Sequence, residues 1–254
     1  MSSPARTNIL GVGVSLVNME QALDQIDRWI RGRDKTYVCI CSVHGVMECQ
    51  RSEDLREIFN RAGMVTPDGM PLVWLARAHD SRVTRVYGPD LILAEFERSK
   101  TAGHRHFLYG GGHGIAARLA ERMRARFPGL QIVGTIEPPV APLNQLASAE
   151  TTAVINAAEP DIVWVGISSP KQERWMATMR ARLKAPVLIG VGAAFDFHSG
   201  TVRQAPRWMQ RSGLEWFFRL VTEPRRLWRR YLVNNPWFIW AVTMQKLGLR
   251  RYEL

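Results

Sequence analysis

The chain has 254 residues and a formal net charge of +11, with 46% hydrophobic and 22% charged residues. This composition excludes a disordered chain, a collagen-like repeat and a polytopic membrane protein. Three cysteines, Cys39, Cys41 and Cys49, are too few and too closely spaced for a disulfide framework, and they fit a reducing cytosol. The basic excess predicts a phosphate-bearing partner: a nucleic acid, a nucleotide or an anionic lipid.

The first 200 residues alternate between short β-branched segments and helical segments. The expected strands are Ile9–Val14, Tyr37–Cys41, His106–Tyr109, Gln131–Gly134, Ile162–Gly166 and Val187–Val191. The expected helices are Met19–Ile30, Glu53–Arg61, Pro89–Lys100, Gly114–Phe127, Asn144–Ala157 and Pro170–Leu183. This alternation predicts an α/β fold with a Rossmann-like, mostly parallel sheet and helices on both faces. We expect residues 1–200 to form one α/β catalytic domain.

Residues 201–254 are expected to form a separate basic, amphipathic helical appendage. They hold eleven Lys and Arg against three Glu, about +8 of the net charge, which leaves about +3 for the first 200 residues. They also hold five of the nine tryptophans. On a helical projection of residues 225–232, the apolar side chains share one face and the arginines share the other: Arg225, Arg226, Arg229 and Arg230. We favour contact with an anionic membrane surface over the alternative, in which the helices pack on the α/β domain with a solvated arginine face.

No segment predicts a membrane span or a signal peptide. The longest apolar run, Trp237–Met244, is much shorter than the roughly 20 residues that a spanning helix needs. The apolar N-terminal segment is short and is broken by Gly11 and Gly13. We therefore expect a cytoplasmic protein lying peripherally on the inner face of the cell membrane, and a homo-oligomer is compatible with the sequence.

The first candidate for chemistry is Asp68, in the turn Thr66-Pro67-Asp68-Gly69-Met70-Pro71. This turn follows a short apolar segment and precedes a helix, so Asp68 is expected at the carboxyl end of a strand, where open α/β sheets bind their ligands. A carboxylate there can act as a general base towards a substrate hydroxyl. The alternative is a simple turn in which Asp68 caps the helix.

A second candidate is the glycine-rich segment Tyr109-Gly110-Gly111-Gly112-His113-Gly114, between a strand and a helix. The backbone amides of Gly110 and Gly111 are expected to approach a diphosphate near the helix N-terminus. The spacing matches neither the dinucleotide-binding fingerprint nor a P-loop. A tight strand-to-helix turn without a ligand is an equal alternative.

Two further loops are expected to reach the same sheet edge and to share one cleft with the others. Lys171 and Gln172 follow Ser168-Ser169-Pro170 at the start of a helix, where they are placed to hold phosphate or sugar hydroxyls. Asp196 follows the strand ending near Val191. No Asp-x-Asp element and no His/Cys cluster predicts a metal site, and no cofactor is expected.

Together these motifs resemble the WecG/TagA/CpsF glycosyltransferases (glycosyltransferase family 26) over nearly the whole chain. The residues that carry the resemblance are Pro67-Asp68-Gly69-Met70, Arg85-Val86-Tyr87-Gly88-Pro89-Asp90, Tyr109-Gly110-Gly111, Ser169-Pro170-Lys171-Gln172-Glu173, Gly192-Ala193-Ala194-Phe195-Asp196-Phe197, Arg203-Gln204-Ala205-Pro206, and Leu214-Glu215-Trp216 with Arg219 and Glu223-Pro224-Arg225.

The resemblance implies an inverting, metal-independent transfer of a sugar from a UDP-sugar to a polyprenyl-diphosphate-linked glycan at the inner membrane face. It implies that Asp68 is the catalytic base and that Arg85 and Gln172 bind substrate. It further implies that arginines of the appendage meet the lipid diphosphate: Arg219, Arg225, Arg226, Arg229 and Arg230.

The chain departs from the family pattern at one place. Where members often have Thr-x-Asn, this sequence has Ile40-Cys41-Ser42-Val43-His44. Ser42 stands at the position of the Asn, and His44 is expected to supply substrate contacts or a second acid/base group. This variant resembles the exopolysaccharide branch of the family, in which the donor can be a hexose such as UDP-glucose, and it argues less for N-acetylmannosamine as the sugar.

Two other functions are compatible with parts of the sequence. A nucleotide-dependent oxidoreductase or epimerase shares the α/β fold but requires an NAD(P) site that the glycine spacing does not support. A non-enzymatic basic adaptor for membrane or nucleic acid would use the appendage alone. Because the charge is concentrated with tryptophans in residues 201–254, we expect no nucleic-acid partner.

Overall fold

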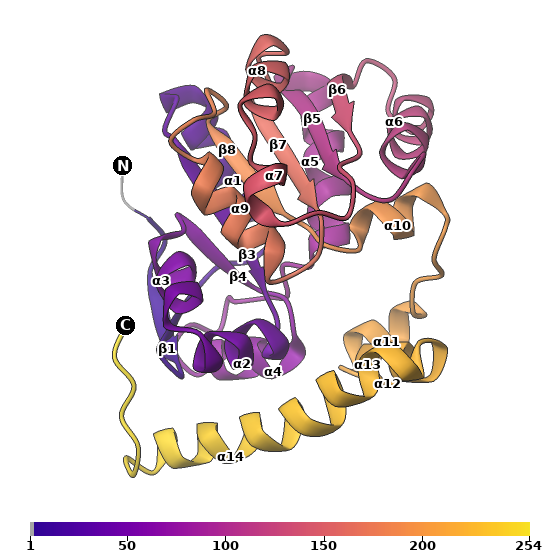
Figure 1. The fold of residues 1–254 in the computed structure, drawn as a ribbon. Coiled ribbons are helices and arrows are strands. Elements are labelled where there is room, and N and C mark those ends of the chain that lie inside the picture. Colours follow the sequence, from indigo (N-terminus) through magenta and orange to yellow (C-terminus); the bar gives the residue numbers. More distant parts are fainter. Residues whose placement is uncertain (1–2) are drawn as a thin grey trace. The chain divides into compact units, whose positions relative to one another are not determined.

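The computed structural model describes residues 3–254, apart from the side chains of Arg226, Arg229 and Arg230. The fold is α/β, with a six-stranded sheet in the order β4-β3-β8-β7-β5-β6 (Figure 1). The strands are β3 (Thr36–Cys41), β4 (Met64–Pro67), β5 (Arg105–Gly110), β6 (Gln131–Ile136), β7 (Ile162–Gly166) and β8 (Val187–Gly190). The pairs β3–β8, β8–β7, β7–β5 and β5–β6 are parallel. This confirms the predicted fold class.

The chain forms two compact units, which we call unit 1 (Met1–Asn18, Cys41–Arg85 and Gln204–Leu254) and unit 2 (Met19–Ile40 and Val86–Arg203). Unit 1 therefore contains the whole C-terminal segment together with two earlier segments. The expected division of the chain into residues 1–200 and 201–254 stays a prediction.

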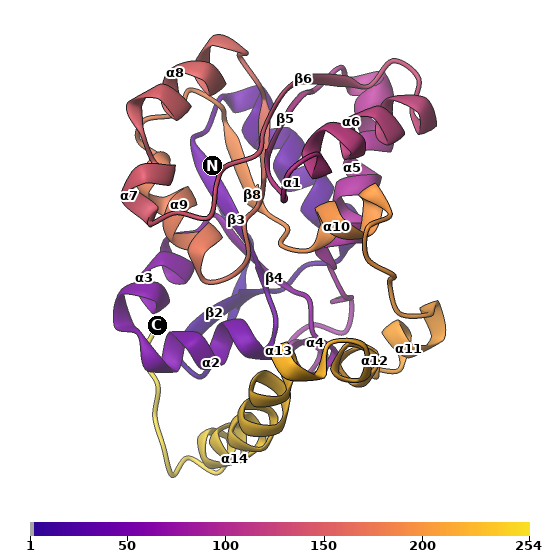
Figure 2. The same ribbon diagram turned by 45° about the vertical axis from the view of Figure 1, so that its right-hand side comes forward.

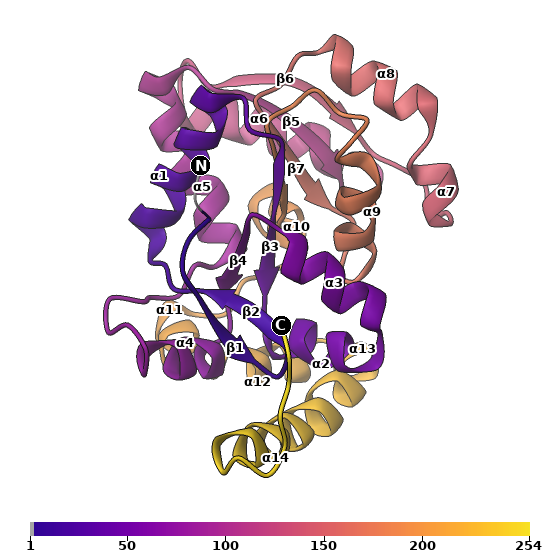
Figure 3. The ribbon, with the colours of Figure 1, turned by 90° about the vertical axis from the view of Figure 1, so that its left-hand side faces the viewer.

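Unit 2 holds the parallel strands and the helices that cover them. The helices are α1 (Met19–Gly32), α5 (Gly88–Ala102), α6 (Ile115–Arg126), α7 (Leu143–Leu146), α8 (Ala149–Ala157), α9 (Lys171–Met179) and α10 (Ala194–Ser199). Helices α1 and α5 cover one face of the sheet and α8 and α9 cover the other (Figure 3). All four residues of β8 and the first four of β7 are buried, because a parallel sheet covered on both faces exposes neither side of its strands.

Unit 1 consists of a β-hairpin, strand β4 and the remaining helices. These elements are β1 (Arg6–Ile9), β2 (Val12–Ser15), α2 (Val43–Arg51), α3 (Glu53–Arg61), α4 (Met70–Arg77), α11 (Arg207–Arg211), α12 (Glu215–Thr222), α13 (Pro224–Trp228), the π-helical turn η1 (Arg229–Val233) and α14 (Asn234–Lys246). Helix α14 runs beside α2 (Figure 2). The Ser15 hydroxyl of β2 accepts a hydrogen bond from the Val65 amide of β4, which ties the hairpin to that strand.

Three predicted elements differ in the structure. The expected strand Ile9–Val14 is instead the hairpin β1–β2, because Leu10 and Gly11 adopt positive φ angles of 51° and 78° and reverse the chain. The expected helix Asn144–Ala157 is two helices, because the Ser148 side chain accepts the Thr151 amide and begins a new helix.

The third difference is the expected helix Pro170–Leu183, which begins at Lys171 and ends at Met179 as α9. Pro170 occupies the N-cap, and neither preceding serine caps the helix. The Ser169 hydroxyl instead donates to the carboxylate of Glu173, in the first turn of the helix.

Candidate active site

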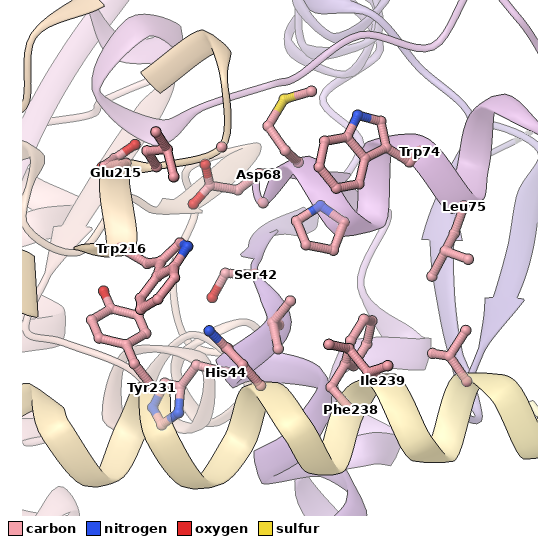
Figure 4. A pocket seen from close by; sticks show the side chains of 18 of the residues that line it. Ser42, His44, Asp68, Trp74, Leu75, Glu215, Trp216, Tyr231, Phe238 and Ile239 are labelled. Atoms are coloured by element: carbon pink, nitrogen blue, oxygen red, sulfur yellow. The ribbon is translucent and has the colours of Figure 1, made fainter. Parts of the chain in front are cut away.

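Asp68 lies directly after β4, as the sequence predicts. Its backbone amide donates a hydrogen bond of 2.9 Å to the carbonyl of Cys41 at the end of β3, which brings the loops after the two strands together. The N-cap of helix α4 is Gly69, and no side chain caps this helix. The alternative in which Asp68 caps it is therefore wrong. Ser42 forms the N-cap of α2 and likewise makes no capping bond. Figure 4 shows the Ser42 hydroxyl and the Asp68 carboxylate on the wall of one cavity.

The Asp68 side chain is held by Arg85. The guanidinium donates to Asp68 Oδ1 from Nε at 3.1 Å and from Nη2 at 2.9 Å, and it also bonds the Asp68 carbonyl. Both nitrogens donate to the same carboxylate oxygen, Oδ1, and together with the bond to the Asp68 carbonyl they fix the side chain relative to its own backbone. Arg85 therefore sets the direction in which Asp68 presents its second carboxylate oxygen.

Glu215, at the start of α12, binds the same guanidinium. Its Oε2 accepts from Arg85 Nη2 at 2.6 Å, and the Asp68, Arg85 and Glu215 side chains are only 19%, 18% and 14% exposed. Two carboxylates thus share one buried cation, and the three groups together carry one negative charge.

The pKa of Asp68 is raised above its ordinary value, and burial is the main cause. The charge of Arg85 opposes the shift, the charge of Glu215 adds to it, and the hydrogen bond from Arg85 and the charge of Arg219 oppose it. A carboxylate with a raised pKa is a stronger base towards a hydroxyl proton than an ordinary aspartate. The arrangement can therefore accept a proton in a partly desolvated site.

These groups line a cavity of about 860 Å³, formed entirely by residues of unit 1. Glu215, Asp68 and Ser42 lie towards one end of it, and Trp74 and Leu75 face Ile239 across the other end (Figure 4). One end of the cavity therefore carries the acidic groups, next to the aromatic side chains of Trp216 and Tyr231, and the other end is apolar. A cavity of this size accommodates a small-molecule ligand.

His44 also lines this cavity, on the first turn of α2. Its Nδ1 lies 3.3 Å from the side-chain nitrogen of Asn234 and 3.8 Å from Glu48 Oε1. Asn234 in turn accepts a hydrogen bond from Arg51. The imidazole is thus oriented by residues of α2 and α14, and its predicted role in substrate contact stays a prediction.

The predicted glycine-rich loop lies in unit 2, after β5. A Cβ atom at Gly110 would lie 2.5 Å from the Gly166 carbonyl oxygen, and the Gly111 amide donates to that oxygen at 3.0 Å. The amides of Gly114 and Ala117 at the start of α6 donate to the Glu137 carboxylate, which lowers the Glu137 pKa against the effect of its burial. The glycines therefore serve the close approach of β5 and β7, and Glu137 occupies the anion position at the helix N-terminus.

The other predicted residues of unit 2 lie on the loops after β7 and β8. Gln172 is buried, with its Oε1 accepting the Gly192 amide at 3.0 Å and its Nε2 donating to Glu173. Lys171 donates to the Ala141 carbonyl at 3.2 Å. Asp196 lies in the first turn of α10, half-buried. The donor-binding roles of these residues and of Gly110 and Gly111 stay predictions.

Of the predicted diphosphate-binding arginines, Arg219 lines the cavity and forms an ion pair of 3.7 Å with Glu223. Arg225 is exposed and does not line it. The side chains of Arg226, Arg229 and Arg230 lie outside the described residues. Within the described part of the chain, no helix is long and apolar enough to cross a membrane, and no group of three His, Cys, Asp or Glu side chains is placed to hold a metal ion.

Sequence reasoning assigned no role to two parts of the cavity. Glu215 is separated from Arg85 by 130 residues, so no local pattern links them. The apolar wall on α4 and α14 was also not predicted, because the apolar residues of α14 are as typical of a helix that contacts a membrane as of one that lines a cavity. The regular spacing of Pro236, Ile239 and Val242 along one face of a helix was the available signal.

The α/β fold, with a buried carboxylate beside a ligand-sized cavity, is compatible with an enzyme that transfers a sugar from a nucleotide sugar. Sequence relationships identify the family. The profile of the glycosyl transferase WecG/TagA/CpsF family matches residues 7–252, and the chain belongs to this family. The chain is therefore a glycosyltransferase, which decides against the oxidoreductase and adaptor alternatives.

Two similar proteins carry the same name, N-acetylglucosaminyldiphosphoundecaprenol N-acetyl-beta-D-mannosaminyltransferase. The protein from Bacillus spizizenii is 31% identical over 196 residues, which cover 77% of this chain and 74% of its own. The protein from Bacillus subtilis (strain 168) is 30% identical over 183 residues, covering 72% and 69%.

Proposed function

We propose that this protein transfers a hexose or N-acetylhexosamine from a UDP-sugar to a polyprenyl-diphosphate-linked glycan, with inversion at the anomeric carbon. The observation that carries the proposal is the Asp68 carboxylate, which is held by Arg85, has a raised pKa and lies on the wall of a cavity whose other end is apolar. An acceptor with a sugar hydroxyl at one end and a hydrocarbon carrier at the other matches both ends of the cavity. The names of the two similar proteins contain such an acceptor.

In the proposed reaction Asp68 accepts the proton of an acceptor hydroxyl while that oxygen bonds the anomeric carbon of the donor. The bond from this carbon to the diphosphate oxygen breaks, and UDP leaves with the electron pair. Arg85 keeps the Asp68 carboxylate in one orientation, so that little reorganisation is needed when the proton moves. Arg219 lines the same cavity and offers a cation to the acceptor diphosphate.

Ser42 and His44 are the proposed determinants of the sugar, because both line the cavity that holds Asp68. We infer a pathway of exopolysaccharide or surface polysaccharide synthesis, with the protein peripheral on the cytoplasmic face of the membrane. The large apolar side chains Trp228, Trp237 and Trp240 are 46%, 49% and 44% exposed, which favours contact with an anionic membrane surface.

The test is a screen of UDP-sugars, UDP-glucose and UDP-N-acetylmannosamine included, against short-chain N-acetylglucosaminyl-diphospho-prenyl acceptors, scored by UDP release and product mass. Asp68→Asn is expected to lower kcat by about 10²–10⁴, the usual contribution of a general base, while keeping an oxygen that accepts from Arg85. The matched control is Asp80→Asn, since Asp80 also pairs with an arginine, Arg82, but lies outside the cavity. Turnover by Asp68→Asn close to that of Asp80→Asn would remove Asp68 from the mechanism.

A further inference from the structure

The apolar wall of the cavity is built by one face each of α4 and α14. Helix α14 contributes Pro236, Ile239 and Val242, spaced three residues apart along one face. Helix α4 contributes Trp74 and Leu75. Figure 4 shows Trp74 and Leu75 across the cavity from Ile239. We call the space between these two helix faces the α4–α14 groove.

Large apolar side chains in this groove are exposed to solvent. Trp74 is 56% exposed and Ile239 is 66% exposed, whereas the core of the protein leaves side chains of this size almost fully covered. Exposing such surface costs free energy, and contiguous apolar surface in a hollow marks a binding site more often than a structural feature.

Contacts outside the groove hold α14 in place. The opposite side of α14 packs on α2, with Asn234 and Ala241 buried. At its other end, the Gln245 side chain accepts the Leu10 amide at 3.0 Å and donates to the Asn8 carbonyl. Because these contacts fix the helix, its groove face is available to a ligand.

The groove opens on the Asp68 wall within one cavity, so an occupant has a polar end and an apolar end. Arg219 lines the same cavity, and its charge acts on the Asp68 carboxylate, so it supplies positive charge for a phosphorylated head group at this end. Two other occupants fit the cavity less well. A free sugar nucleotide would leave the apolar wall without a contact. A bilayer surface is too broad to enter the cavity and reach Asp68. A single hydrocarbon chain carrying a diphosphate fits both ends.

We propose that the α4–α14 groove binds the first isoprene units of the polyprenyl carrier, so that the enzyme recognises the hydrocarbon chain as well as the sugar. This rests on the proposed function for the identity of the acceptor. Each methylene-sized group buried in the groove is expected to tighten binding by about fourfold. Affinity should therefore rise with chain length until the groove is filled.

The experiment measures binding of geranyl, farnesyl and geranylgeranyl diphosphate, which share a head group and differ in chain length, to the full-length protein by calorimetry without detergent or vesicles. The test variants are Trp74→Ser and Ile239→Ser. The matched controls are Trp208→Ser and Val221→Ser, because Trp208 and Val221 are 63% and 64% exposed but do not line the cavity. Thermal melts of all four variants verify that each is folded.

We expect affinity to rise at least tenfold from geranyl to geranylgeranyl diphosphate in the wild-type protein and in both controls, and to rise less than threefold in both test variants. Affinity that is the same for all three chains overturns the proposal and leaves the bilayer as the partner of these side chains. Equal losses in test and control variants also overturn it.

Because binding requires no sugar transfer, the two proposals fail separately. A steep dependence on chain length without UDP release in the sugar screen removes the proposed reaction and leaves the groove. UDP release with no dependence on chain length removes the groove and leaves the reaction. Asp68→Asn should lose turnover and keep the dependence on chain length.

Discussion

The shared arginine makes a specific prediction for Glu215→Gln. The amide still offers an oxygen to Arg85 but removes one of the two negative charges on that guanidinium. Since the charge of Glu215 raises the pKa of Asp68, its removal lowers that pKa. The acidic limb of the kcat/KM profile should therefore move to lower pH, and kcat at neutral pH should fall because Asp68 becomes a weaker base.

The size of the effect follows from the geometry. The accepting oxygens of Asp68 and Glu215 lie 2.9 and 2.6 Å from the same nitrogen. They are therefore within about 5.5 Å of each other, which gives a repulsion of about 0.8 kcal/mol in water and about 3 kcal/mol at an effective dielectric constant of about 20. With the proton about half transferred in the transition state, about half of this energy is lost, so kcat falls about 2- to 13-fold.

The assay is UDP release across the pH range, with Glu57→Gln as the control. Glu57 carries the same charge and pairs with Arg61, but it does not line the cavity. A purely structural role for Glu215 would lower the rate at every pH without moving the acidic limb. An unmoved limb in Glu215→Gln, with kcat of Asp68→Asn lowered as expected, would refute the electrostatic reasoning.

Two further predictions concern other parts of the molecule. Burial of His104 by itself lowers its pKa, but the hydrogen bond to Glu95 at 2.8 Å and the charges of Glu95 and Asp27 raise it overall. The resulting stabilisation is fully present below the ordinary histidine pKa of about 6.5 and is lost as pH rises through the raised value. Urea unfolding should show His104→Gln destabilised most at the acidic end of this range, and a pH-independent difference would contradict this. The second prediction is that the double substitution Trp237→Ser and Trp240→Ser weakens co-sedimentation with anionic vesicles at low salt, since both side chains are half exposed. Equal sedimentation of variant and wild type would remove these tryptophans from the membrane contact.

The sequence by itself determined the fold class and the position of Asp68. Strands such as Ile162–Gly166 are apolar throughout because a parallel sheet is covered on both faces, and this pattern is local enough to read from the sequence. Asp68 follows a strand and precedes a helix, so its place at a strand end also follows from neighbouring residues. Local patterns failed where a single backbone angle decides the path, as at Leu10, whose positive φ turns one expected strand into a hairpin.

Only the tertiary structure decided what surrounds Asp68. Arg85 lies 17 residues further along the chain, and Glu215 lies 130 residues beyond Arg85. Ion pairs over such separations are set by the packing of helices and strands and leave no periodic trace in the sequence. The same is true of the α4–α14 groove, because the spacing of apolar residues predicts an exposed face on each helix but does not predict that the two faces line one cavity. The sequence thus located the Asp68 carboxylate, and the packing of α4, α12 and α14 determined its charge environment and the apolar end of the cavity.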